Sequence, residues 1–120
     1  MPHKSDLLFV TDMLNWAQTA AEFCAGKTLH DIQAIPQNES HLVRALCVIG
    51  EAASRVSQEL RAKYPDIPWQ RMTAMCNRLV HAYSDIDVIV VWSTAVEKIP
   101  ELIAQLESLL KSEQGENKET

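Results

Sequence analysis

The sequence has little glycine: only three of its 120 residues are Gly. They stand singly at positions 26, 50 and 115, so none belongs to a glycine-rich loop of the kind that cradles nucleotide phosphates. We therefore expect no nucleotide bound in that way, and no cofactor is predicted. Gly50 lies within an apolar stretch, where its missing side chain is expected to allow a close approach between helices.

Long apolar runs are also missing. No run approaches the roughly 20 residues that a helix needs to cross a bilayer. The first apolar run, Leu7–Val10, is too short for the hydrophobic region of a signal peptide, and Asp12 soon interrupts the apolar pattern. We therefore expect a cytoplasmic protein that does not associate with a membrane.

Cysteine is scarce, and Cys24, Cys47 and Cys76 are far apart in the sequence. An odd number at wide spacing does not indicate a disulfide framework, and a reducing compartment fits this pattern. No C-x-x-C or closely spaced pair of histidines is present, so a structural zinc site is not predicted. Cys76 and His81 could share a metal, but a small buried thiol near a histidine is the simpler interpretation, and no metal is expected.

The net charge of −5 argues against nucleic-acid binding by the surface as a whole. The charges are unevenly distributed, however. Residues 41–84 hold six Lys and Arg against three Asp and Glu, whereas residues 85–120 hold three against eight. A local basic cleft on an acidic protein is able to admit an RNA phosphate while non-specific affinity stays low. Solvated helix faces are the alternative explanation, which we favour for Arg61 and Lys63.

The chain is long enough for one domain with one core. Apolar residues recur at helical spacing, and Val88–Trp92 is the one run that resembles a strand. We interpret it as buried helix, because Asp85 or Asp87 can cap it. The prediction is an all-α fold, an antiparallel bundle of four or five helices over residues 1–112, with a polar, disordered tail over residues 113–120.

Capping residues and prolines mark the limits of the first two predicted helices. Ser5 is a suitable N-cap for the first helix, and Gly26 is expected just past its end. A connector or short helical turn follows, with Pro36 as a breaker. The second helix is predicted to begin near residues 38–40 and to end at Pro65.

The second half of the chain is divided in the same way. Pro68 suits the first position of a third helix, which is predicted to end near Tyr83. Residues 84–87 are expected to form a turn and an N-cap. A fourth helix then covers Val88–Lys98, and Pro100 either kinks it or starts a new helix.

The most informative segment is residues 75–83, Met-Cys-Asn-Arg-Leu-Val-His-Ala-Tyr, which we call the motif segment. Asn77 and His81 are four residues apart on the third predicted helix, so they share a face, and Arg78 lies three residues before His81. The apolar pair between them can anchor the helix in a core, which would hold the polar groups on a rigid element. A histidine near a core is more often structural than catalytic, so this pattern alone is a weak signal.

The motif segment resembles the R-N-x-L-V-H-x-Y motif of the HEPN superfamily, in particular the HepT-like toxins. The resemblance extends from Leu42 to about Leu102, roughly half of the chain. Several short matches in the same order make it more specific than one motif: residues 43–46 (Val-Arg-Ala-Leu), 49–52 (Ile-Gly-Glu-Ala), 67–69 (Ile-Pro-Trp), 91–92 (Val-Trp) and 100–102 (Pro-Glu-Leu).

The resemblance implies a HEPN-like homodimer, in which the motifs of two chains face each other across one composite cleft, and metal-independent cleavage of RNA. His81 would be the general acid or base at the 2′-hydroxyl or the leaving 5′-oxygen, because an imidazole ordinarily titrates near neutral pH. Asn77 would orient the histidine or the phosphate. Arg78, Arg71 and Arg44 are the residues expected to bind RNA.

One position departs from the family pattern. The family has an arginine five residues before the histidine, where this chain has Cys76. A cysteine supplies no fixed positive charge and no paired donors for a phosphate. Losing one such group typically costs about 10²–10³ in rate. We therefore expect weak or absent nuclease activity, unless Arg78 takes over, and the sequence does not distinguish a natural from an introduced substitution.

The resemblance also implies a partner, a minimal nucleotidyltransferase that acts as the antitoxin. In some HepT-like toxins the tyrosine two residues after the histidine is adenylylated, and Tyr83 occupies that position. An AMP group would add bulk and negative charge to a cleft meant for RNA phosphate. The alternative is a tyrosine that packs at the helix end with its hydroxyl in solvent.

A second class of function stays open beside the toxin ribonuclease. The chain would then be a non-catalytic helical dimer that binds a nucleotidyltransferase or another protein, with the motif kept for packing. Composition does not separate the two classes.

Overall fold

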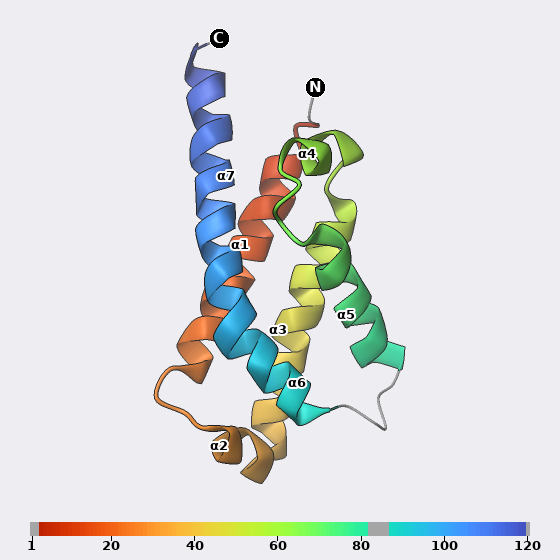
Figure 1. Ribbon diagram of the computed structural model, residues 1–120, viewed down its shortest axis with the longest axis vertical. Helices are drawn as coiled ribbons and strands as arrows, with labels where there is room; N and C mark the ends of the chain where they lie inside the picture. Colours follow the sequence, from red (N-terminus) through yellow and green to blue (C-terminus); the bar gives the residue numbers. More distant parts are fainter. Residues whose placement is uncertain (1–2, 82–86, 120) are drawn as a thin grey trace.

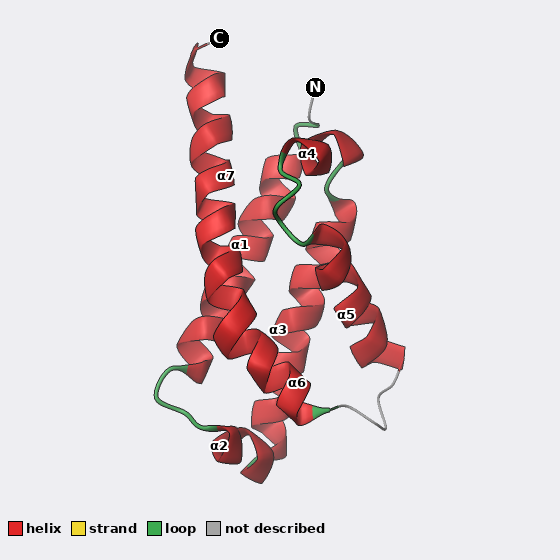
Figure 2. Ribbon diagram, in the orientation of Figure 1, coloured by secondary structure: helices red, strands yellow, loops and turns green. Residues whose placement is uncertain are grey.

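The computed structural model describes residues 3–81 and 87–119, apart from the side chains of residues 79–81 and 116–119. Every regular element within these ranges is helical (Figure 2). Seven α-helices and one π-helical turn are present there. The predicted all-α fold class is confirmed.

Four long helices form the body of the molecule: α1 (Asp6–Cys24), α3 (Pro36–Arg55), α5 (Trp69–His81) and α7 (Ile99–Glu119). Successive long helices run in opposite directions, so the bundle is antiparallel (Figure 1). Helix α3 is central, because it packs against both α1 and α5, and α7 packs against α1. The dimer expected from the resemblance stays a prediction.

Three short helices link the long ones: α2 (Leu29–Ala34), α4 (Gln58–Lys63) and α6 (Val88–Ser93). Each begins at a side-chain cap that satisfies backbone N–H groups left free in its first turn. Thr28 accepts from the amide of Asp31 at 3.3 Å, and Ser57 accepts from that of Leu60 at 3.3 Å. Asp87 accepts from the amide of Ile89 at 3.0 Å, as predicted for the N-cap before residue 88.

The core is centred on α1, which packs against α3 and against α7. Its largest fully buried apolar side chains recur at helical spacing, with exposed polar residues between them. Burial of each one stabilises the folded state by roughly 1.5–3 kcal/mol. They include Val10, Met13, Leu42, Ile49, Ile99, Leu102, Leu106 and Leu109. Within the described ranges, none of the helices combines the length and the apolar character that a membrane crossing requires.

The limits of the first helix follow the sequence, but those of the second do not. Helix α1 has Ser5 as its N-cap, and Gly26 adopts φ +77° just beyond its end, a left-handed conformation that glycine takes without strain. Pro36, expected as a breaker, is the first residue of α3. A proline is tolerated there because its missing N–H would have no helical partner.

The predicted second helix is in fact two helices, because α3 ends at Arg55 and α4 begins at Gln58. Ser57 caps α4 at this division, and Asp6, which is buried at the start of α1, binds Ser57 there. The Asp6 carboxylate accepts from the Ser57 amide at 2.9 Å and from the Ser57 hydroxyl at 2.6 Å. It also accepts from the amide of His3 at 2.9 Å. Burial alone raises the pKa of Asp6, but these hydrogen bonds outweigh it and bring the pKa below its ordinary value.

The last part of the bundle accommodates Pro100 through a π-helical turn, η2 (Thr94–Lys98), between α6 and α7. A proline ring clashes with the carbonyl four residues earlier in a regular helix, and the wider turn relieves that contact.

Residues 113–119, which the sequence assigns to a disordered tail, continue α7 as helix. Glu113 is buried there, and its carboxylate accepts from Lys63 Nζ at 2.8 Å and from the hydroxyl of Tyr64 at 2.6 Å. These contacts attach α7 to the end of α4.

Candidate functional site

Helix α5, which carries the motif segment as far as His81, is held closely against α3. A Cβ added to Gly50 on α3 would lie 2.6 Å from the carbonyl oxygen of Met72, so only glycine fits at this crossing. The hydroxyl of Thr73 donates to the Gly50 carbonyl at 3.4 Å. The expected role of Gly50 in close helix approach is confirmed. This close packing holds α5 rigidly on α3, so the residues on the opposite face of α5 also have fixed positions.

That other face is a polar stripe in solvent. Arg71, Ala74, Asn77 and Arg78 are exposed, whereas Met72 is buried. The four exposed positions follow the helical repeat and lie on one side of α5. His81 is the last residue of α5, four positions after Asn77. The side chain of His81 and all of Tyr83 lie outside the described residues, so their predicted roles stay predictions.

Cys76 lies on the side of α5 that faces α3, away from the exposed stripe. It is half-buried, and a Cβ on Gly50 would be 2.7 Å from its Cβ. The thiol of Cys47 on α3 donates to the Cys76 carbonyl at 3.9 Å. Burial, followed by the neighbouring Cys76 thiol, raises the pKa of Cys47 to about 12, so Cys47 is a neutral thiol at physiological pH.

The three arginines predicted to bind RNA are all exposed, but they occupy different positions. Because α3 and α5 are antiparallel and Cys47 meets Cys76, Arg44 lies one turn nearer the end of α5 where His81 stands. Arg78 lies at that end too. Arg71 is seven residues earlier on α5, about 10 Å along the helix axis.

The basic residues in this part of the chain differ in their ion pairs with the described residues. Arg55 pairs with Glu51 at 3.1 Å, and Lys63 pairs with Glu113. In contrast, Arg44, Arg71 and Arg78 form no ion pair with any residue that the structure describes. An unpaired, exposed guanidinium is suited to a phosphate, which it binds through two parallel hydrogen bonds.

Two features of the site were not found from the sequence. One is the contact between Cys47 and Cys76, although Cys47 lies three residues before Gly50 and so shares its helix face. The other is that position 76 faces α3. Among the described side chains, no three His, Cys, Asp or Glu residues gather closely enough to hold a metal ion.

Comparison with known proteins gives a consistent family assignment. The family model described as Ribonuclease HepT-like matches residues 13–109. A protein of Thermococcus cleftensis named as a probable ribonuclease HepT is 32% identical over 86% of this chain and 94% of its own length. A candidate RNase of Methanocaldococcus jannaschii is 30% identical over 98% of this chain and 97% of its own length. No solved structure matches the chain significantly.

Proposed function

Because this chain belongs to the HepT-like ribonuclease family, we propose that it is the toxin of a toxin–antitoxin pair, built to cleave RNA without a metal at a cleft between two copies. The observation that carries this proposal is the exposed stripe of α5, which brings Asn77 and Arg78 to the surface one turn before His81. The names of the relatives support an RNA substrate.

In the proposed mechanism, His81 moves the proton. An imidazole titrates near neutral pH, so it can accept a proton from the 2′-hydroxyl or donate one to the leaving 5′-oxygen. Asn77 orients the imidazole or the phosphate through its amide. Arg78 and Arg44 hold the phosphate, whose negative charge increases in the transition state.

Cys76 is proposed to impair this activity. It replaces the family's arginine, its thiol adds no positive charge, and it is half-buried against α3. An arginine at position 76 keeps the same Cβ beside Gly50, and its longer stem can extend along the α3–α5 contact to solvent. The substitution is therefore compatible with the fold.

The direct test compares RNA cleavage by the chain and by its Cys76→Arg variant, with a metal chelator present. We expect a gain of about 10²–10³ in rate from the restored arginine. Cys76→Ser is the matched control, since it changes the side chain without adding charge, and it should leave the rate unchanged. A gain by both variants would contradict the electrostatic explanation.

Arg78 provides a second explanation, because it is exposed on the same stripe as Asn77. If it replaces the missing arginine, the unmodified chain already cleaves RNA and Arg78→Ala abolishes cleavage. If neither the chain nor Cys76→Arg degrades RNA while both are folded and dimeric, the chain is instead a non-catalytic interaction module for a nucleotidyltransferase.

Regulation is proposed to act on Tyr83 through adenylylation by a minimal nucleotidyltransferase partner. The intact mass after incubation with that partner and ATP should rise by one AMP group. Tyr83→Phe should prevent the rise, because the chain's other tyrosine, Tyr64, has its hydroxyl bonded to Glu113. An unchanged mass of the unmodified chain would refute modification. The homodimer is tested separately by light scattering during size-exclusion chromatography.

A further inference from the structure

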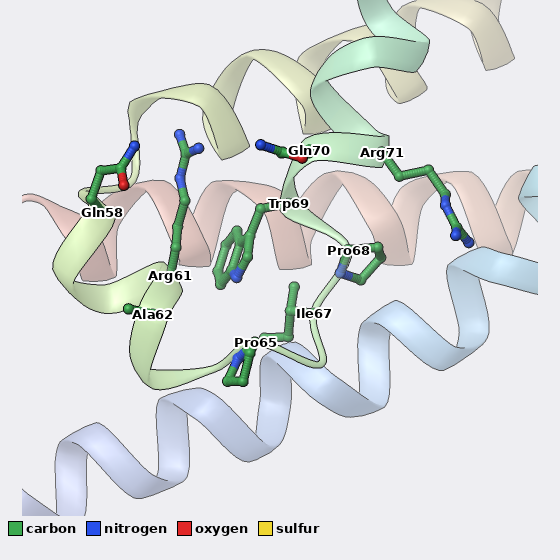
Figure 3. Close-up of a pocket in the computed structure, with 9 residues that line it drawn as sticks. All are labelled: Gln58, Arg61, Ala62, Pro65, Ile67, Pro68, Trp69, Gln70 and Arg71. Carbon is green, nitrogen blue, oxygen red and sulfur yellow. The ribbon is translucent and has the colours of Figure 1, made fainter.

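A groove of about 520 Å³ lies between α4 and the first turn of α5, at the end of α5 opposite to His81 (Figure 3). Its polar lining consists of Gln58, Arg61, Gln70 and Arg71. In Figure 3, the polar ends of Gln58, Arg61 and Gln70 lie along one side, and Arg71 extends beyond Pro68 on the other. The described part of the groove contains no carboxylate among its lining residues.

The guanidinium of Arg61 is fixed in this groove. Its Nε donates to the carbonyl of Val56 at 3.0 Å, and its Nη2 donates to the carbonyls of Ala53 at 3.0 Å and Ser54 at 2.9 Å. These carbonyls stand at the end of α3, where they orient the guanidinium and, as neutral dipoles, offset only part of its charge. Among the described residues Arg61 has no carboxylate partner, and neither has Arg71. The solvated-face interpretation of Arg61 therefore does not describe it.

The groove presents charged and amide side chains rather than an aromatic surface on which a base could stack. Trp69 lines it, but this side chain is only 5% exposed and its indole N–H is committed to the Tyr64 carbonyl at 3.0 Å. A base needs an accessible aromatic face to stack on. Such a groove therefore fits the charged backbone of a ligand better than its bases.

The exposed stripe of α5 connects the groove with the proposed cleavage site. Arg71 lines the groove, and Arg78 lies two helical turns away on the same exposed stripe, with the small exposed residue Ala74 between them. The separation along the axis is about 10 Å. An extended RNA strand bound at Arg78 is therefore able to reach Arg71 without crossing a bulky or acidic side chain of this stripe.

We propose that the α4–α5 groove is a second binding site for single-stranded RNA, which holds the phosphates of nucleotides that flank the cleaved bond. Arg61 and Arg71 bind the phosphates, and Gln58 and Gln70 donate to phosphate or sugar oxygens. This inference rests on the proposed function, because it extends the same substrate beyond the motif.

The test measures binding of fluorescently labelled single-stranded RNA by anisotropy, since binding is measurable even if Cys76 prevents cleavage. One RNA of about 4 nucleotides covers only the motif, and one of about 12 nucleotides also reaches the groove. We expect the longer RNA to bind about tenfold more tightly. Its salt dependence should be steeper, by about 0.7 in logarithmic slope for each added phosphate contact.

Gln70→Glu is the discriminating variant, because it adds a negative charge to the groove. It should weaken binding of the longer RNA severalfold and leave the shorter RNA unaffected. No acidic residue stands in the first turn of α5, and a negative charge there stabilises a helix, so lost affinity would not reflect unfolding. Gln33→Glu, at an exposed position on α2, is the matched control and should change neither affinity.

Arg71→Gln is the second variant, and it should lower the salt slope of the longer RNA by about 0.7. Equal affinities for the two RNAs, or insensitivity of the longer RNA to Gln70→Glu, would overturn the groove proposal and leave the cleavage proposal standing. Failure of both RNAs to bind the unmodified chain would instead refute the proposed function together with this site.

Discussion

Gly50 and Cys76 face each other at the closest approach of α3 and α5, where a Cβ on Gly50 would lie 2.7 Å from that of Cys76. Helix α5, which carries the motif segment as far as His81, is thereby held on α3 by a contact that no larger residue at position 50 allows. Any residue other than glycine at position 76, arginine included, has a Cβ in the same place. The exposed face of α5 depends on this contact for its position.

Gly50→Ala tests that dependence. The added carbon would also lie 2.6 Å from the Met72 carbonyl oxygen, which belongs to the backbone and cannot rotate away. Overpacking costs about 1–3 kcal/mol, and the better helix propensity of alanine offsets part of it. We expect the free energy of unfolding to fall by about 1–2 kcal/mol in urea titrations. Gly115→Ala is the control, since nothing lies within 4 Å of its added carbon; equal effects of the two substitutions would contradict this explanation.

Asp6 makes stability depend on pH. Hydrogen bonds from Ser57 and His3 lower its pKa in the folded state, despite burial. The stabilisation is therefore present above the ordinary value of 3.8 and is lost as the pH falls through the lower folded value. Asp6→Asn should destabilise the protein by about 1–3 kcal/mol at neutral pH and flatten this acid limb of the stability curve.

Thermal unfolding followed by circular dichroism from pH 7 to about pH 2 measures the effect of Asp6. Asp12→Asn changes an exposed carboxylate on the same helix and should leave the curve unchanged. An acid limb that persists in Asp6→Asn would assign the pH dependence to other groups.

Cys47 should resist alkylation in the folded protein. Burial and the Cys76 thiol raise its pKa to about 12, so at pH 8 only about one thiol in 10⁴ is the reactive thiolate. We expect iodoacetamide to modify Cys47 about a thousandfold more slowly than in the chain unfolded in guanidinium. Peptide mapping by mass spectrometry gives both rates, and similar rates would show that this thiol is not shielded.

Glu113 should hold the last turns of α7. Burial alone raises its pKa, but Lys63 and Tyr64 outweigh it and lower the pKa below 4.5. Glu113→Gln leaves Lys63 without this charge, and we expect a loss of about 1 kcal/mol because the pair is partly exposed. Hydrogen exchange should accelerate in α7 beyond Lys111. Glu107→Gln, exposed on the same helix, is the control, and unchanged exchange in Glu113→Gln would mean that other contacts hold these turns.

Local signals account for much of the fold. Gly26 and Asp87 act where the sequence predicts, because caps and left-handed glycines depend on neighbours within a few residues. Ser5 stands at the predicted start of α1, but its side chain makes no capping hydrogen bond. The break between α3 and α4 was missed although Ser57 is a local N-cap signal, and the contact that supports it comes from Asp6, about fifty positions away in the chain. The continuation of α7 beyond residue 112 was missed because the contacts of Glu113 are with Lys63 and Tyr64, about fifty positions away in the chain.

The sequence by itself determined the helical fold class, the family and the spacing of Asn77, Arg78 and His81, because periodicity and motif spacing are local properties of a helix. Only the tertiary structure decided that Cys76 faces α3 while Asn77 and Arg78 face solvent. It also placed Arg61 beside Gln70 and Arg71 in one groove. The first arrangement arises from the packing of α3 against α5, and the second from the path of the chain through α4 into α5, and neither follows from local periodicity.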